Sequence, residues 1–355
     1  MLNPCETLNR KNMLSKAAKR RQRKNKLLGA KEKPLLTEIP DGKLDGKLDG
    51  KPEGKDVFFA METGDPDDVI ALLWLIAHPQ ITLRGIAVSK GSANQVGYLR
   101  MLLRKINDSI PLPDIPVGPV SPETKKDHLS HGIVKMFGFT DFTPSEYGER
   151  GVNLLSTFLE VYPQCTVLTG GPLTVIQECL ERNPELKIYN LVTQGGFAGA
   201  RCVAKEHQLE KFRDVVAIGT WNFNTDIKAA KYVLQSDRIL HKRFVSKDVC
   251  HGVVWTNEIH TAVSQALQKP GVHPAWQIMY DGMDQYRSRP HRLPKKLHDP
   301  LAALCIVNPK VCEFMEVEIE STRGGWGSYP KKGTNNWISV QLHMDLFTQG
   351  FLTFE

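Results

Sequence analysis

Four acidic side chains lie in one short segment, the turn at residues 62–68. The turn holds Glu62, Asp65, Asp67 and Asp68, which are four carboxylates within seven residues. A hard cation such as Ca²⁺ prefers several oxygen ligands, and neighbouring carboxylates on a short loop supply them together. The turn therefore predicts a metal site, with carboxylates that can also accept protons.

Helix capping is the alternative interpretation of this turn. Asp65 suits an N-cap, Pro66 suits the first helical position, and Asp67 and Asp68 fall in a first turn, where acids favour the helix dipole. Considered alone, these residues follow ordinary helix-start rules, which favour capping. Residues far away in the sequence change that balance.

The acidic turn lies between a predicted strand and a predicted helix. Residues 57–61 form an apolar run, and residues 67–78 have an amphipathic period. The same alternation continues, with strands expected at 83–89, 165–168 and 187–192 and helices at 93–106 and 173–182. Repeated strand, turn and helix indicate an α/β fold with a doubly wound, mostly parallel sheet and helices on both faces.

Glycine-containing loops follow three of the predicted strands, at residues 89–92, 169–172 and 194–196. The carboxyl ends of parallel strands meet at one edge of the sheet, where α/β enzymes bind their ligands. Glycine there lets the backbone approach a ligand closely, although each glycine is equally explained as a turn former. The acidic turn and these loops are thus expected to share one crevice.

A second acidic motif appears near the C-terminal end as His298-Asp299-Pro300 before an apolar helical run. Its sequence predicts Asp299 as an N-cap and Pro300 as the first helical residue. His298 offers a group that titrates near neutrality and can donate a proton. His131 lies in an irregular segment that could fold over a cleft, although a lone loop histidine is usually only polar surface.

Charge is distributed unevenly over the 355 residues, whose formal net charge is +7. Residues 1–35 hold 11 of the 46 basic residues and 2 of the 39 acidic ones, which leaves 35 basic and 37 acidic residues afterwards. We expect residues 1–55 to be a basic disordered tail ending in an Asp-Gly-Lys-Leu repeat linker, and residues 56–355 to form a single catalytic domain. The basic run at 19–26 fits a nuclear signal, a nucleic-acid patch, an organellar transit segment or a solvated tail.

The cysteines and apolar runs bear on location. Seven scattered cysteines form no CxxC pair, which indicates reduced intracellular thiols. No apolar run approaches the roughly 20 residues of a membrane span. We therefore expect a cytoplasmic or nuclear protein that has no membrane partner, with organellar import still open.

Six motifs in order make the chain after the tail resemble the inosine-uridine-preferring nucleoside hydrolases, whose first pattern is Asp-x-Asp-Pro-Gly-x-Asp-Asp. The matching segments are Asp67-Asp68, Gly171-Pro172-Leu173-Thr174, Gln194-Gly195-Gly196, Asn222-Phe223-Asn224 with Asp226, His298-Asp299-Pro300-Leu301-Ala302, and Arg323-Gly324 with the strand-like residues 337–342. The resemblance implies hydrolysis of the N-glycosidic bond of a ribonucleoside by a metal-bound water, with Ca²⁺ as the cofactor. A homo-oligomer is expected only by analogy with that family.

The resemblance also implies residue roles. Asp68 and Asp299 become metal ligands, together with the backbone carbonyl of Gly170. Asp67 accepts a hydrogen bond from a ribose hydroxyl, and His298 lies on the side of the leaving base. The other positions carried over to the substrate are Asn222, Asn224, Ser92, Lys90 and His131.

The chain departs from the family pattern at the acidic turn itself. Thr63 stands where the family has an Asp that binds the metal and acts as the general base. Asp65 is the better candidate for a replacement base, because Glu62 should point away from the face used by Thr63 if the strand alternation continues. Asn222 likewise replaces a family Glu, which keeps hydrogen bonding but loses charge.

Three functions follow from this mixture of matches and departures. The first is a calcium-dependent nucleoside hydrolase with a rearranged base. The second is a related N-glycosidase or ribosyltransferase acting on a modified or phosphorylated nucleoside, whose phosphate Lys90 could pair. The third is a non-catalytic relative that binds a nucleoside or a partner protein, since fold does not guarantee function.

Overall fold

The computed structural model describes residues 54–354 apart from 122–125, 146–147 and 324. Strand β1 begins at Lys55, directly after the first described residue. The predicted disordered tail and nearly all of the repeat linker lie outside the described residues. The domain boundary at residue 55 therefore stays a prediction.

A single sheet of nine strands runs through the described residues in the order β3-β2-β1-β4-β5-β6-β9-β7-β8. All neighbouring pairs from β3 to β9 are parallel, whereas β7 is antiparallel to both β9 and β8. The predicted mostly parallel sheet is thus confirmed. The strands are β1 (Lys55–Met61), β2 (Ile81–Val88), β3 (Val117–Pro119), β4 (Thr166–Thr169), β5 (Ile188–Gln194), β6 (Ile239–Val245), β7 (Cys312–Thr322), β8 (Gly325–Pro330) and β9 (Asn336–Leu342).

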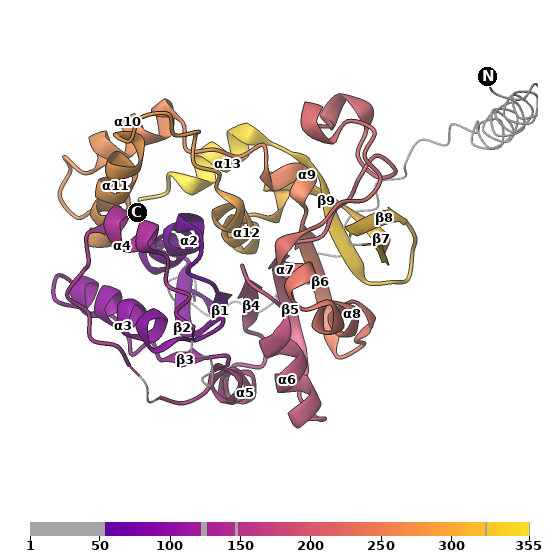
Figure 1. Ribbon diagram of the computed structural model, residues 1–355, viewed down its shortest axis with the longest axis horizontal. Helices are drawn as coiled ribbons and strands as arrows, with labels where there is room; N and C mark the ends of the chain where they lie inside the picture. Colours follow the sequence, from indigo (N-terminus) through magenta and orange to yellow (C-terminus); the bar gives the residue numbers. More distant parts are fainter. Residues whose placement is uncertain (1–53, 122–125, 146–147, 324, 355) are drawn as a thin grey trace, which may run out of the picture. The chain divides into compact units, whose positions relative to one another are not determined.

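Helices cover both faces of this sheet (Figure 1). Helices α2 (Pro66–Ala77) and α12 (His298–Val307) pack together on one face, and α5 (Gly151–Val161), α6 (Thr174–Arg182) and α8 (Ile227–Gln235) cover the other. The remaining helices are α3 (Ala93–Asn107), α4 (His131–Phe137), α7 (Trp221–Thr225), α9 (Lys247–Cys250), α10 (Asn257–Ala266), α11 (Pro274–Arg287) and α13 (Met344–Phe351), with short 3-10 turns η1 (Lys205–His207), η2 (Glu210–Phe212) and η3 (Pro309–Val311).

Strand β1 shows how the sequence builds these two layers. Phe58 and Ala60 belong to one buried apolar cluster with side chains of α5, α6 and α8. Phe59 and Met61 are also fully buried but alternate to the opposite face of the strand. An apolar run without polar alternation is therefore expected here, because neither face of a parallel sheet covered by helices is exposed to solvent.

The connections reverse direction between β1 and β4. From β1 the chain proceeds outwards to β2 and β3, whereas from β4 it proceeds the other way to β5 and β6. Open α/β sheets bind ligands at such a switch point, outside the carboxyl ends of the strands. The acidic turn follows β1 and Gly170 follows β4, so both lie at this point of the sheet.

Two expectations about composition can be compared with the described residues. The six cysteines that the structure describes are free and buried, in agreement with reduced thiols. No helix in the described ranges is both long enough and apolar enough to cross a membrane.

His78 ends helix α2 and makes the stability of this layer sensitive to acid. Its ring lies 4.5 Å from the Trp74 ring, and its Nδ1 accepts the backbone N–H of Gln80 at 3.2 Å. Burial lowers the pKa of His78 from 6.5 to about 4. Between these pH values the unfolded chain binds a proton that the folded chain does not, so the free energy of unfolding falls as the pH falls.

We expect the His78→Asn variant to lose part of this pH dependence. Asparagine keeps an acceptor for the Gln80 N–H but cannot be protonated, so the fall in unfolding free energy between pH 6.5 and about 4 becomes shallower. Urea unfolding across this range measures the slope. His291→Asn, a change at an exposed loop position, is the matched control. An unchanged slope in His78→Asn would show that His78 does not carry the effect.

Candidate active site

The acidic turn caps helix α2 and also contributes to a buried cluster. The Asp65 side chain accepts the backbone N–H of Asp67 at 3.3 Å, and Pro66 is the first helical residue. The capping interpretation is therefore confirmed for Asp65. Asp67 and Asp68 differ, because both are almost completely buried and capping of their own helix does not account for them.

Asp67 joins the acidic turn to the C-terminal motif. Its Oδ2 accepts the backbone N–H groups of His298 at 3.0 Å and Asp299 at 3.3 Å, across more than 230 residues of sequence. Helix α12 starts at His298 with Leu297 at the N-cap position and no local side-chain cap. The prediction that Asp299 is the N-cap is therefore wrong, because the distant carboxylate of Asp67 performs that role.

Three buried carboxylates consequently lie together. Oxygen atoms of Asp67, Asp68 and Asp299 all lie within 4.8 Å of one another. Burial and mutual repulsion raise the pKa values of Asp68 and Asp299 well above the ordinary value. Asp299 Oδ1 is buried and has no hydrogen-bond partner among the described residues. A buried acceptor without a donor, among like charges, fits a site for a cation.

Gly170 brings strand β4 against this cluster. A Cβ atom at Gly170 would lie 2.7 Å from Asp299 Cγ, so only glycine permits the observed approach. The Gly170 carbonyl accepts Asn222 Nδ2 at 3.0 Å. The same amide also donates to the backbone and side-chain oxygens of Gln194, at 2.8 and 2.9 Å. Asn222 thus fastens the loops after β4 and β5 to each other.

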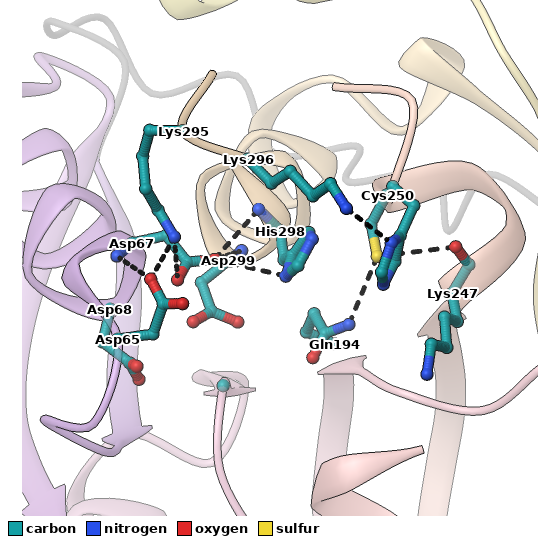
Figure 2. Close-up of polar contacts among 12 residues, drawn as sticks. Asp65, Asp67, Asp68, Gln194, Lys247, Cys250, Lys295, Lys296, His298 and Asp299 are labelled. Atoms are coloured by element: carbon teal, nitrogen blue, oxygen red, sulfur yellow. Dashed lines mark hydrogen bonds and ion pairs between the residues drawn. The ribbon is translucent and has the colours of Figure 1, made fainter. Parts of the chain in front are cut away.

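Lys295 also belongs to the site, although no sequence motif indicated it. Its side chain is only 6% exposed, and its ammonium group pairs with Asp65 and lies 3.3 Å from Asp67 Oδ1 (Figure 2). Although burial lowers it, the charges of Asp67 and Asp65 raise the pKa of Lys295 overall. The only signal in the sequence was a basic residue close to the His298-Asp299 motif.

Glu62 also lies at the site, although its side chain and that of Thr63 contact different helices, α7 and α3. Its Oε2 accepts the indole N–H of Trp221 at 2.8 Å, and its charge helps to raise the pKa of Asp68. Burial raises the pKa of Glu62 itself. Strand β1 ends at Met61, so the alternation of side chains no longer applies to the next residue.

Thr63 and Ser92 are used mainly to position helix α3. Thr63 Oγ1 accepts Gln95 Nε2 at 2.8 Å, and Ser92 caps α3 while donating to Asp127 Oδ1 at 2.9 Å. Lys90 is exposed nearby, where its positive charge offsets part of the rise in the pKa of Glu62 that burial causes. Thr63 is therefore a buried hydroxyl that a neighbouring amide holds in place.

His131 and Asn224 lie at the periphery. His131 is the exposed first residue of α4, and the preceding Ser130 N–H donates to the Thr63 carbonyl at 3.1 Å. This contact places the start of α4 beside the acidic turn. Asn224, near the end of α7, is exposed and its Oδ1 accepts Trp326 Nε1 at 2.8 Å.

His298 lies next to the carboxylates as a neutral imidazole. Its Nδ1 is 3.6 Å from Asp67 Oδ2, and its Nε2 is buried without a partner in the structure. Burial and the charge of Lys295 lower the pKa of His298 to about 3. In this state the ring does not titrate near neutrality, so it is uncharged at pH 7.

Residues 57–349 match the family model described as inosine-uridine preferring nucleoside hydrolase. The chain belongs to this family. Among curated relatives of this nucleoside hydrolase, an uncharacterized protein of Aquifex aeolicus is 29% identical, over 80% of this chain and 94% of the relative. The pyrimidine-specific ribonucleoside hydrolase RihA of Salmonella gallinarum is 27% identical, over 81% of this chain and 92% of the relative.

Solved structures share the fold of this nucleoside hydrolase. The purine-preferring ribonucleoside hydrolase from Gardnerella vaginalis aligns with a TM-score of 0.60 at 19% identity, over 84% of this chain and 97% of its own. The plant nucleoside hydrolase PpNRh1 aligns with a TM-score of 0.59 at 14% identity, over 85% and 98% of the two chains. The family is metal-dependent, and the cluster of Asp67, Asp68 and Asp299 supplies an acidic site of the kind that a metal needs.

Proposed function

We propose that this chain hydrolyses the N-glycosidic bond of a ribonucleoside to free base and ribose, with Ca²⁺ held by Asp68, Asp299 and the carbonyl of Gly170. The observation that carries this proposal is the buried, unpartnered Oδ1 of Asp299, which lies among like charges at the switch point of the sheet. Ca²⁺ prefers carboxylate and carbonyl oxygens, which are the atoms available there. When bound, the ion would contribute Lewis acidity towards water and ribose hydroxyls.

The protein groups around the cluster suit the charge that develops on the sugar. Cleavage of an N-glycosidic bond gives the ribose oxocarbenium character, which nearby carboxylates stabilise. Asp67 is fixed for this purpose by Lys295 and by two N–H groups of α12. One of its oxygens would accept a ribose hydroxyl, with Asn222, Asn224, Ser92, Lys90 and His131 bordering the sugar and the base.

The hydrolysis also needs a proton acceptor. The water oxygen bonds to the anomeric carbon, its proton passes to a carboxylate, and the electrons of the C–N bond leave with the base. Asp65 is one candidate, but it already caps α2 and pairs with Lys295. Burial raises the pKa of both carboxyl groups, so the pKa shifts do not separate them. Glu62 is favoured because, among the described residues, its carboxylate has no lysine partner and accepts a hydrogen bond from Trp221. Neutral His298 would hydrogen-bond the departing base through its unpartnered Nε2.

Release of free base from a panel of nucleosides tests the function directly. The panel contains uridine and inosine, since the named relatives include pyrimidine-specific and purine-preferring enzymes. We expect base release with Ca²⁺ and its loss with a chelator. If no nucleoside is cleaved and Ca²⁺ leaves the melting temperature unchanged, the proposal fails. Binding of Ca²⁺ and nucleoside without cleavage would instead identify a non-catalytic nucleoside-binding protein.

Paired substitutions distinguish the two candidate bases. Glu62→Gln keeps the shape and the acceptor for Trp221 but removes the basic carboxylate, so we expect kcat to fall by at least about a hundredfold, the usual range of general base catalysis. Asp65→Asn should reduce kcat much less, since its cap to Asp67 can be kept by the amide oxygen. Initial rates at saturating Ca²⁺ and substrate make the comparison. The reverse order of effects would assign the base to Asp65.

A further inference from the structure

A group of basic side chains lies on the far side of His298 from the carboxylates. His251, directly after α9, stacks on His298 with ring centroids 4.6 Å apart. The ammonium groups of Lys211 and Lys296 both reach His251 Nδ1, the latter at 3.1 Å. Figure 2 shows Lys296 on this side of His298 and Asp67 on the other. We call Lys211, Lys296 and His251 the lysine cluster.

The lysine cluster lacks a negative counter-charge. In the part of the chain that the structure describes, neither ammonium group pairs with a carboxylate. Burial and the adjacent Lys296 lower the pKa of Lys211 to about 8. Burial and the surrounding positive charges lower the pKa of His251 to about 2. Bringing an anion between these groups would relieve their repulsion and use their free donors.

A metal ion is the other ligand to consider here. Cys250, His251 and His298 have ligand atoms that lie close enough together to bind one metal ion. However, two ammonium groups point at the His251 ring nitrogen and oppose a cation. Burial also raises the pKa of the Cys250 thiol, which disfavours the thiolate that a metal requires. The charges of this cluster therefore favour an anion.

The position of the lysine cluster places it next to the base of a bound nucleoside. If ribose binds at the carboxylates, as the proposed function requires, the glycosidic bond faces His298 and the base extends towards His251. We propose that the lysine cluster binds an acidic substituent of the leaving base, so that the preferred substrate is a nucleoside whose base carries a carboxylate or another oxyanion. This inference rests on the proposed function for its placement, whereas anion binding itself can be measured separately.

Calorimetry with free bases tests the site without turnover. Orotate and uracil differ by one carboxylate, and we expect orotate to bind at least about tenfold more tightly, a difference of about 1.4 kcal/mol. The double variant Lys211→Met, Lys296→Met should lose this preference. Lys187→Met removes an exposed lysine before β5, at the opposite edge of the sheet, and serves as the control. Equal binding of the two bases, or a preference that survives the double variant, would overturn the site.

Kinetics on matched substrates then test its placement. Orotidine, uridine and uridine 5′-phosphate separate an anion on the base from an anion on the sugar. We expect kcat/KM to be highest for orotidine and its advantage over uridine to vanish in the double variant but not in Lys187→Met. An advantage of the 5′-phosphate alone would refute placement on the base side. If orotate binds through the lysines but no nucleoside is cleaved, the proposed hydrolysis fails while the anion site stands.

Discussion

Replacing Asp299 with asparagine is expected to abolish both calcium binding and base release. The amide has the same shape, but it removes one of the three clustered charges and the unpartnered Oδ1 of the carboxylate. We expect kcat/KM to fall at least about a thousandfold, or roughly 4 kcal/mol of transition-state stabilisation. The metal-free protein should at the same time become more stable, because the repulsion by Asp68 and Asp67 that helps to raise the pKa of Asp299 is removed.

Melting temperatures with and without Ca²⁺ measure both the loss of calcium binding and the gain in stability of the metal-free protein. The rate of base release measures the loss of activity. Asp237→Asn is the matched control, since Asp237 is exposed in the turn before β6, at the amino end of the strand. An Asp299→Asn protein that keeps the calcium-induced rise in melting temperature would exclude Asp299 as a ligand. Activity lost without any change in calcium binding would assign Asp299 a role with the substrate alone.

Replacing Lys295 with methionine is expected to destabilise the metal-free protein and to increase its response to calcium. The ammonium group is the internal cation of the acidic cluster, 3.3 Å from the buried Asp67 carboxylate. Removing one partner of a buried ion pair usually costs about 3–5 kcal/mol, because the remaining charge stays buried. A metal ion would then offset more of the unpaired charge than it does in the natural protein.

Denaturant unfolding with and without Ca²⁺ is the measurement for Lys295. Lys295→Arg retains the charge and should recover part of the lost stability, although the planar guanidinium does not fit the same contacts equally. Lys187→Met again controls for the loss of a lysine at the other edge of the sheet. If Lys295→Met unfolds at the same denaturant concentration as the natural chain, the ion pair with Asp67 does not contribute to stability.

Local patterns in the sequence predicted the scaffold well. The expected strand at 57–61 became β1 (Lys55–Met61), and the expected helix at 67–78 became α2 (Pro66–Ala77). Apolar runs and cap residues act within a few positions of themselves, so they can be recognised without the fold. The Asp65 cap is of this kind, because its donor is the N–H only two residues later.

The parts that were predicted wrongly or missed depend on contacts between distant segments. Asp299 was expected to cap α12, but Asp67 does so from the other end of the domain. Glu62 is directed by Trp221, which lies 159 residues away. Lys295 reaches Asp65 across 230 residues. Residue types and spacing alone contain no information about such partners, so their roles emerge only when the strands and helices are assembled.

The cap that Asp67 places on α12 also has a consequence for how the protein acquires its site. More than 230 residues separate the two partners, so the entropy of closing a long loop must be overcome before the carboxylates meet. A nascent or proteolysed chain that lacks α12 would carry the acidic turn without Asp299, so the carboxylate cluster would be incomplete. If the proposed calcium site is correct, calcium affinity would report that these two distant segments have come together, and it would separate native molecules from those in which they have not.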